Sequence, residues 1–209
     1  MRRWSAWQEV LVGVAVSVCV TGVGQAAAAQ AAGAKEEFSK EVAAVLEKRI
    51  GMLQELTEDP VILQAVKESN EKNGAVPLTD ILTVDRKWIA KDKSVDAFIK
   101  SLMTNACANR LMVFQDAHDG YPEVFVADAK GANVCLTNRT SDYYQADEGW
   151  WVEGYNAGHG KTFYGKIEYD ESAMAESIPV FLPVMDSATG QAIGVMKVIV
   201  DLTAIKREL

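Results

Sequence analysis

Residues 175–202, AESIPVFLPVMDSATGQAIGVMKVIVDL, decide the fold that this sequence predicts. Two runs rich in Val, Ile and Phe, 175–186 and 191–202, are separated by the short stretch Asp186–Gly190. The Asp, Ser, Thr and Gly of that stretch are typical of turns, and the flanking runs have the composition and length of strands. The sequence therefore predicts an antiparallel pair of strands near Leu209.

Three further strand-like segments come before this pair. The runs 123–128 (EVFVAD) and 132–138 (ANVCLTN) are joined by a turn that contains Gly131, and they predict a second hairpin. The run 161–170 (KTFYGKIEYD) is expected to form the remaining strand. We therefore expect five strands, all in the second half of the chain.

The first half of the chain is typical of helices. Its apolar residues recur at helical spacing, and Pro60 separates a long first helix from the next one. Ser94 is the expected N-cap of the fourth helix. The predicted helices span residues 36–56, 59–70, 77–90 and 94–117. Helices followed by strands predict an α+β domain, with the helices packed on a five-stranded antiparallel sheet.

The N-terminal 29 residues are predicted to be a signal peptide. Two arginines open the chain, an apolar run covers residues 10–23, and small residues follow, with cleavage expected within Ala26–Gln30. The apolar run is shorter than the roughly 20 residues that span a bilayer. We therefore expect an exported, periplasmic protein in which residues 30–209 form one domain. An uncleaved N-terminal anchor is the alternative.

Charge and cysteine content exclude several classes of function. The chain has 29 acidic and 21 basic residues, and a surface of that charge repels nucleic acid. It lacks CxxC motifs and Cys/His pairs at metal spacing, so we expect no metal and no cofactor. Cys107 and Cys135 follow the signal. They are either bridged, which export to an oxidising compartment permits, or two small buried apolar residues.

Residues 140–151, TSDYYQADEGWW, are the most unusual stretch of the chain. They contain two tyrosines, two tryptophans and three acids, with no Lys or Arg. Aromatic faces attract cations by about 0.5 to 2 kcal/mol, and a desolvated carboxylate makes a charge-assisted hydrogen bond. The stretch therefore suits a positively charged ligand such as an amine. The other interpretation is a core-forming loop whose acids face water while its rings pack.

A resemblance to a known family is carried by residues 123–151, 169–172 (YDES) and 183–198. These segments are similar to the Cache (PAS-like, PDC) extracytoplasmic sensor domains of bacteria, and the resemblance extends from Lys35 to Leu202. It implies a long N-terminal helix along a five-stranded sheet, and a small-molecule pocket between that sheet and residues 140–151. It also implies that the fourth helix lies near the first hairpin, which favours a bridge between the two cysteines.

The same resemblance implies a set of site residues. Amino-acid-sensing members carry a Tyr, an Arg five positions later, a Trp followed by a second aromatic, and a later Asp. Tyr143, Trp150, Trp151 and Asp170 match four of these positions, but Glu148 stands where the family has its Arg. In the family the Arg holds the ligand carboxylate and the Asp holds its ammonium, so a cationic metabolite is expected here. The predicted ligand-binding residues are Tyr143, Tyr144, Asp147, Glu148, Trp150, Trp151 and Asp170.

We therefore predict an exported, free-standing sensor domain that binds a small molecule and performs no chemistry. It is expected either to act through another protein, for which a membrane-bound signalling partner is a candidate, or to scavenge or buffer its ligand. Two alternatives belong to other classes. One is an exported enzyme that uses carboxylates such as Asp147 and Asp170 for acid–base work. The other is an interaction protein whose helix 36–56 pairs with a partner or with a second copy of itself as a homodimer.

Overall fold

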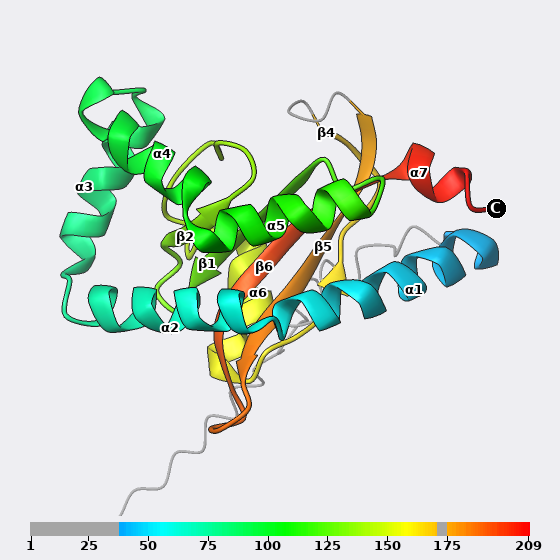
Figure 1. Cartoon of the computed structure of the whole chain (residues 1–209), viewed down its shortest axis with the longest axis horizontal. Coiled ribbons are helices and arrows are strands. Elements are labelled where there is room, and N and C mark those ends of the chain that lie inside the picture. The colour runs from blue at the N-terminus through cyan, green and yellow to red at the C-terminus, as the bar shows by residue number, and fades with distance from the viewer. Residues whose placement is uncertain (1–37, 171–174) are drawn as a thin grey trace, which may run out of the picture. The chain divides into compact units, whose positions relative to one another are not determined.

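A computed structural model of the chain describes residues 38–169 and 176–209 in full, and the backbone alone of residues 170 and 175 (Figure 1). The described residues all belong to one compact unit. The predicted signal peptide, residues 1–29, and its cleavage site lie outside the described residues. Within the described part of the chain, no helix is both long and apolar enough to cross a membrane.

Four of the described helices, α1, α2, α5 and α7, begin at a capping side chain. Ser39 Oγ accepts a hydrogen bond from the Val42 amide at 3.3 Å, so the first helix starts at Lys40, later than the expected 36. The helical elements are α1 (Lys40–Thr57), α2 (Pro60–Gly74), α3 (Leu78–Ile89), η1 (Lys93–Val95), α4 (Asp96–Thr104), α5 (Ala106–Ala117), α6 (Gly149–Tyr155), η2 (Asn156–Gly158) and α7 (Leu202–Lys206).

The strands form one antiparallel sheet with the order β2-β1-β6-β5-β3, and β4 also pairs with β5. The long hairpin of residues 175–202 lies in the sheet interior as β5 and β6, and it confirms the predicted pairing. The α+β class is likewise confirmed. The strands are β1 (Glu123–Asp128), β2 (Asn133–Leu136), β3 (Phe163–Tyr164), β4 (Glu168–Asp170), β5 (Ala175–Asp186) and β6 (Gln191–Asp201).

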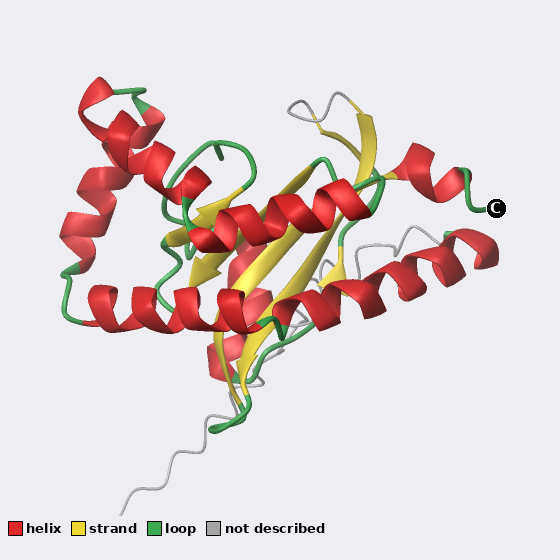
Figure 2. Ribbon diagram, viewed as in Figure 1, coloured by secondary structure: helices red, strands yellow, loops and turns green. Residues whose placement is uncertain are grey.

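The two faces of the sheet are covered differently (Figures 1 and 2). Helices α1, α2 and α5 lie on one face, and α6 lies on the other. The main core is on the first face, where Val126, Val180 and Val198 are fully buried. Large apolar side chains of α1 pack into this core, and none within Lys40–Thr57 is fully exposed. The homodimer through this helix stays a prediction.

The sheet has six strands in the described residues, where the sequence predicted five. Residues 161–170 form two short strands, β3 and β4, which pair with β5 on either side of Pro179. Proline has no amide hydrogen to donate to a ladder. Gly165 N instead donates to Pro179 O at 2.8 Å, and a Cβ at Gly165 would lie 2.7 Å from Pro179 Cγ. The predicted single strand is therefore interrupted at this point.

The predicted fourth helix, 94–117, is also divided. It breaks at Asn105, whose Oδ1 accepts from the Ala108 amide at 2.8 Å and whose Nδ2 donates to Val134 O at 2.9 Å. An Asn side chain that bonds the backbone in this way starts a new helix. Ser94 is not the N-cap that we expected, because it lies within η1 and its amide donates to Asp92 Oδ1 at 2.8 Å.

Cys107 of α5 and Cys135 of β2 form a disulfide, with an S–S distance of 2.06 Å. The bridge joins positions 28 residues apart and ties the helical half of the chain to the first hairpin. Of the two alternatives that the sequence left open, the bridge is confirmed. Both residues are also buried.

Candidate functional site

A row of large side chains crosses the sheet on the face that α6 covers. Strand register places Lys197 of β6 directly between Phe125 of β1 and Phe181 of β5. Leu136 and Phe163 extend the row on β2 and β3. Cross-strand neighbours lie close enough for their side chains to touch. The row therefore sets one cation between two aromatic rings near the middle of the sheet.

Trp150 of α6 covers this row. Its ring is stacked on Phe181, with centroids 5.3 Å apart, and meets Phe125 edge-on at 5.8 Å. Lys197 Nζ lies 5.4 Å from the centroid of the Trp150 ring and 5.8 Å from that of Phe125. A cation at this distance from a ring face is attracted by its quadrupole. Lys197 is half-buried as a residue, its ammonium lies beside two aromatic rings, and no carboxylate among the described residues lies within ion-pair distance of it.

Trp151 belongs to the same helix but is more deeply placed. It is buried with Ala127 and Val195, and its ring stacks on Tyr155 with centroids 4.7 Å apart. Its indole Nε1 is buried with no hydrogen-bond partner among the described residues. Gly154 allows this close approach, because a Cβ there would lie 3.0 Å from Val195 Cγ1. Trp151 therefore fixes α6 to the sheet.

The loop before α6 is held against the turn of the first hairpin. Gln145 N donates to Gly131 O at 2.7 Å, and Ala132 pairs with Tyr144 in an isolated antiparallel bridge. Gly131 has a φ of +78°, and a Cβ there would lie 2.4 Å from Ala146 N. A side chain at this position would therefore clash with the loop backbone.

Tyr143 has different ring partners from the two tryptophans. Its ring stacks on Trp88 of α3 at 5.7 Å and meets Phe98 of α4 edge-on at 5.3 Å. Burial, and then the negative charge of Asp128, raise the pKa of its hydroxyl to about 12. The carboxylate of Asp85 accepts from the Tyr143 amide at 2.8 Å. Tyr143 and Trp150 therefore pack in one apolar cluster with Phe125 but have different ring partners, and Trp151 packs in a neighbouring cluster.

The predicted acidic residues contribute less to a cation-binding site than the sequence led us to expect. The Asp147 and Glu148 side chains are exposed, so neither is the desolvated carboxylate that a cation site needs. Tyr144 is half-buried, and burial followed by the charge of Asp147 raises its pKa. Asp170 ends β4, but its side chain lies outside the described residues. No group of three or more His, Cys, Asp or Glu in the described part is placed to hold a metal ion.

Sequence reasoning missed the central residues of this site, Phe125, Phe181 and Lys197. One signal was present, since Lys197 interrupts the otherwise apolar run Ile193–Val200 of a predicted strand. A lysine inside such a run is unusual, because strands in the middle of a sheet bury most of their side chains. The sequence alone could not show which rings would surround it.

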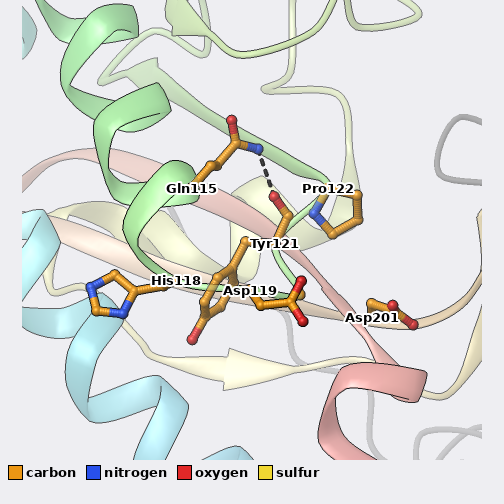
Figure 3. Close-up of a pocket in the computed structure, with 7 residues that line it drawn as sticks. Gln115, His118, Asp119, Tyr121, Pro122 and Asp201 are labelled. Atoms are coloured by element: carbon orange, nitrogen blue, oxygen red, sulfur yellow. Dashed lines mark hydrogen bonds between the residues drawn. The ribbon is translucent and has the colours of Figure 1, made fainter.

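A separate cavity of about 260 Å³ lies where α5 ends and β1 begins (Figure 3). Gln115 Nε2 donates to Tyr121 O at 2.6 Å across its edge. Burial raises the pKa of the Tyr121 hydroxyl, and the nearby charge of Arg49 partly opposes this. Arg49 is in turn paired with Glu208 of the C-terminal segment. None of the predicted ligand-binding residues lines this cavity.

Comparisons with known proteins give structural matches only. No protein-family model matches the chain, and no curated protein matches it. The similar solved structures include the sensory domain of the Campylobacter jejuni chemoreceptor Tlp3 with isoleucine bound, at 13% identity and a TM-score of 0.38. They also include the ligand-binding domain of the Pseudomonas aeruginosa amino-acid chemoreceptor PctC with GABA, at 15% and 0.35. A third is the sensor domain of the V. cholerae histidine kinase DctB, at 16% and 0.35.

These matches cover about two thirds or more of this chain and two thirds or less of each of the other structures. The match covers 81% of this chain for Tlp3, 66% for PctC and 70% for DctB. The chain spans 66% of the Tlp3 and PctC structures and 58% of the DctB structure. All three are sensory domains, the class that the sequence resembles. Because identity and TM-score are both low, their ligands are not transferred to this chain.

Proposed function

We propose that this domain is an exported small-molecule sensor and that its ligand binds on the α6 face of the sheet, against Lys197 and Trp150. One observation carries the proposal: a half-buried lysine, Lys197, is paired with Phe125 on one side and Phe181 on the other at the middle of the sheet. Removing an ammonium from water without a charged partner costs free energy, and an apolar side chain would fit this row better. An apolar residue at this position would make the protein more stable than the lysine does. A residue that is present despite such a cost in stability points to a functional role.

The charge of Lys197 sets the class of ligand. An ammonium with aromatic walls is a receptor for a carboxylate or a similar anion, with which it makes a charge-assisted hydrogen bond. The cationic ligand that the sequence predicts needs an anionic anchor instead. Asp147 and Glu148 face solvent, which leaves Asp170 as the remaining candidate. The anion is therefore the proposed ligand, and the cation is its rival.

A sensor must also pass its state to another protein. Trp150 sits on the short helix α6, and a ligand that reaches Lys197 would displace its ring from Phe181. Movement of α6 would then reach β6 through the contact of Trp151 with Val195. We propose that a membrane-bound partner reads this change, and that the domain itself performs no chemistry.

The test is a thermal-shift screen of small carboxylates, amines and amino acids, followed by calorimetric titration of the best compound. We expect a carboxylate to bind, and Lys197→Met to weaken it by about 10- to 100-fold through loss of one charge-assisted hydrogen bond. Lys100→Met removes an exposed lysine of α4 and is the matched control, with unchanged affinity expected.

Three results would count against the proposal. Equal affinities in the wild type and Lys197→Met would show that the ammonium does not bind the ligand. A best ligand that is an amine, weakened by Asp170→Asn and indifferent to Lys197→Met, would establish the cationic rival. A compound that the protein converts, detected by mass spectrometry during the titration, would indicate the enzyme alternative.

A further inference from the structure

The C-terminal end of α3 carries a cluster of basic residues, here called the basic tip. Its members are all exposed: Arg86, Lys87, Lys91, Lys93 and Arg139. Arg139 comes from the loop after β2 and joins the cluster because its guanidinium donates to the carbonyl of Trp88 at 2.7 Å. None of the five forms an ion pair within residues 38–169 and 176–209. Figures 1 and 2 place α3 and α4 at one extremity of the domain, far from α7.

The acids of the same segment serve mainly the local fold. Asp85 is buried, and its carboxylate accepts from the Tyr143 amide at 2.8 Å. Asp92 is the N-cap of η1, and its Oδ1 accepts from the Ser94 amide at 2.8 Å. Asp96 is exposed in the first turn of α4, where the helix dipole favours an acid. The positive charge of the basic tip is therefore not neutralised by direct pairing, and it suits an anionic partner.

Lys91 occupies a backbone position that favours glycine. Its φ is +54°, in the left-handed region. The end of α3 is a Schellman motif, in which Lys91 N donates to Trp88 O at 3.0 Å and Asp92 N donates to Lys87 O at 2.9 Å. Glycine is the usual residue at the left-handed position of this motif, because a Cβ is disfavoured there. Lysine is therefore present at a cost in stability, which points to a role for its charge.

An exposed apolar side chain accompanies the basic tip. Ile89 is the last residue of α3 and is 57% exposed. Leu78, the first residue of α3, is 49% exposed and lies on the same side of the helix, since the two are separated by about three turns. Exposed apolar side chains flanked by lysine and arginine are typical of protein surfaces that lie in the interfacial region of a membrane.

We propose that the basic tip binds the surface of a membrane that contains anionic phospholipids, with its cations at the lipid phosphates and Ile89 inserted among the headgroups. Each Lys or Arg near such a surface strengthens binding by about fivefold. The net charge of the whole chain, −8, does not prevent this contact. At physiological salt the field of a distant acid is screened beyond about 8 Å, and a tip at one extremity can approach a flat surface ahead of the rest of the domain.

The experiment is sedimentation of the exported protein with lipid vesicles. One set contains equal parts of phosphatidylglycerol and phosphatidylcholine, and the other contains phosphatidylcholine alone. We expect binding to the first set only, and we expect it to weaken by about tenfold or more when NaCl is raised from about 0.05 to about 0.5 M. Inorganic phosphate at the concentration of the lipid phosphate should not displace the protein, because it offers neither a charged surface nor a place for Ile89.

Lys91→Gly separates binding from folding. It removes a cation and relieves the backbone at once, so it should raise the urea midpoint and yet weaken vesicle binding by about fivefold. Lys91→Arg keeps the charge and should bind as the wild type does. Lys166→Gln is the matched control, since Lys166 is an exposed lysine between β3 and β4, and it should leave binding unchanged.

A second pair of variants tests the apolar contact. Ile89→Ala keeps the helix but removes most of the inserted side chain, and it should weaken vesicle binding by about three- to tenfold. Val113→Ala removes apolar atoms from a residue of α5 that is 60% exposed, and it should bind as the wild type does.

Several outcomes would overturn the inference. Absence of binding to phosphatidylglycerol vesicles, or equal binding to both sets, would remove the role of anionic lipid. Unchanged binding by Lys91→Gly, or an equal loss in Lys166→Gln, would show that the basic tip is not the contact surface. Binding to soluble polyglutamate as tight as that to vesicles, with Ile89→Ala unaffected, would indicate an acidic protein as the partner instead. None of these measurements involves the small-molecule ligand, so failure of this inference is distinguishable from failure of the proposed function.

Discussion

Arg49 donates from Nε to Glu208 Oε1 at 2.9 Å and thereby joins α1 to the segment that follows α7. The guanidinium is almost fully buried, at 5% exposure of its side chain, and it also donates to Asp119 O at 2.9 Å. A buried charge that loses one partner is costly, even though the intact pair contributes little to stability. A single substitution at Arg49 or Glu208 therefore removes a contact between α1 and the segment that follows α7.

We expect Glu208→Gln to lower the free energy of unfolding at neutral pH by about 1 to 2 kcal/mol, because Arg49 loses its ionic partner. Urea unfolding measures this. Lys48→Met is the control, since Lys48 is exposed and contacts Glu208 only at 3.5 Å, and a change below about 0.5 kcal/mol is expected. A loss as large in Lys48→Met would show that general surface charge is responsible.

The same pair makes an acid-dependent contribution. Burial raises the pKa of the Glu208 carboxyl, but the hydrogen bond and charge of Arg49, and then those of Lys48, outweigh it and lower that pKa below its ordinary value. A carboxyl with a lowered folded-state pKa stabilises the protein above its unfolded pKa, and this stability is lost as pH falls through the folded pKa. The difference between wild type and Glu208→Gln should therefore shrink below about pH 4.

At alkaline pH, Tyr143 should make the protein less stable. Its pKa is raised to about 12, so between its ordinary pKa and that value the unfolded chain ionises while the folded one does not. Stability is unaffected below the unfolded pKa and falls as pH rises above it, by up to about 3 kcal/mol for this group. Tyr143→Phe should flatten that fall in urea midpoints measured from neutral to high pH. An unchanged slope would mean that Tyr143 titrates normally.

Removal of the disulfide should lower stability by about 3 to 4 kcal/mol, because it closes a loop of 28 residues in the unfolded chain. The comparison is the double variant Cys107→Ala with Cys135→Ala against the wild type, in urea without reductant. Wild type with reductant should behave as the double variant does. Two alkylated thiols on unfolded, unreduced wild type would contradict the bridge.

Asn105 divides α4 from α5, so Asn105→Ala should destabilise the protein by about 1 to 2 kcal/mol through loss of the cap and of the bond to Val134 O. Asn109→Ala is the matched control one turn later, where the exposed side chain makes only a 3.4 Å contact with Thr104 O. A loss in Asn105→Ala no larger than that in Asn109→Ala would show that the cap and the bond to Val134 O contribute little to stability.

Export can be checked independently of the fold. We expect the mature protein to begin within Ala26–Gln30, because small residues occupy the positions that a signal peptidase reads. N-terminal sequencing of exported protein is the measurement. A chain that still begins at Met1 and fractionates with membranes would establish the uncleaved anchor.

The sequence by itself determined the elements and their general arrangement. Apolar spacing marked the helical half, and the composition of residues 175–202 marked the central hairpin, because both signals depend only on neighbours along the chain. Two interruptions were harder to predict, one in the fourth predicted helix and one in the predicted strand 161–170. Asn105 is a local signal that the sequence contains, whereas the break between β3 and β4 depends on Pro179, which acts on a strand that is distant in sequence.

Only the tertiary structure decided how the site residues are grouped. Tyr143 and Trp150 are seven positions apart, yet Tyr143 packs with Phe98 of α4 whereas Trp150 packs with Phe181 of β5. Which side chains a loop residue contacts depends on the path of the loop over the folded domain, and no residue pattern encodes that path. Lys197 acquired its aromatic neighbours in the same way, through strand register, which is set by pairing across the whole sheet.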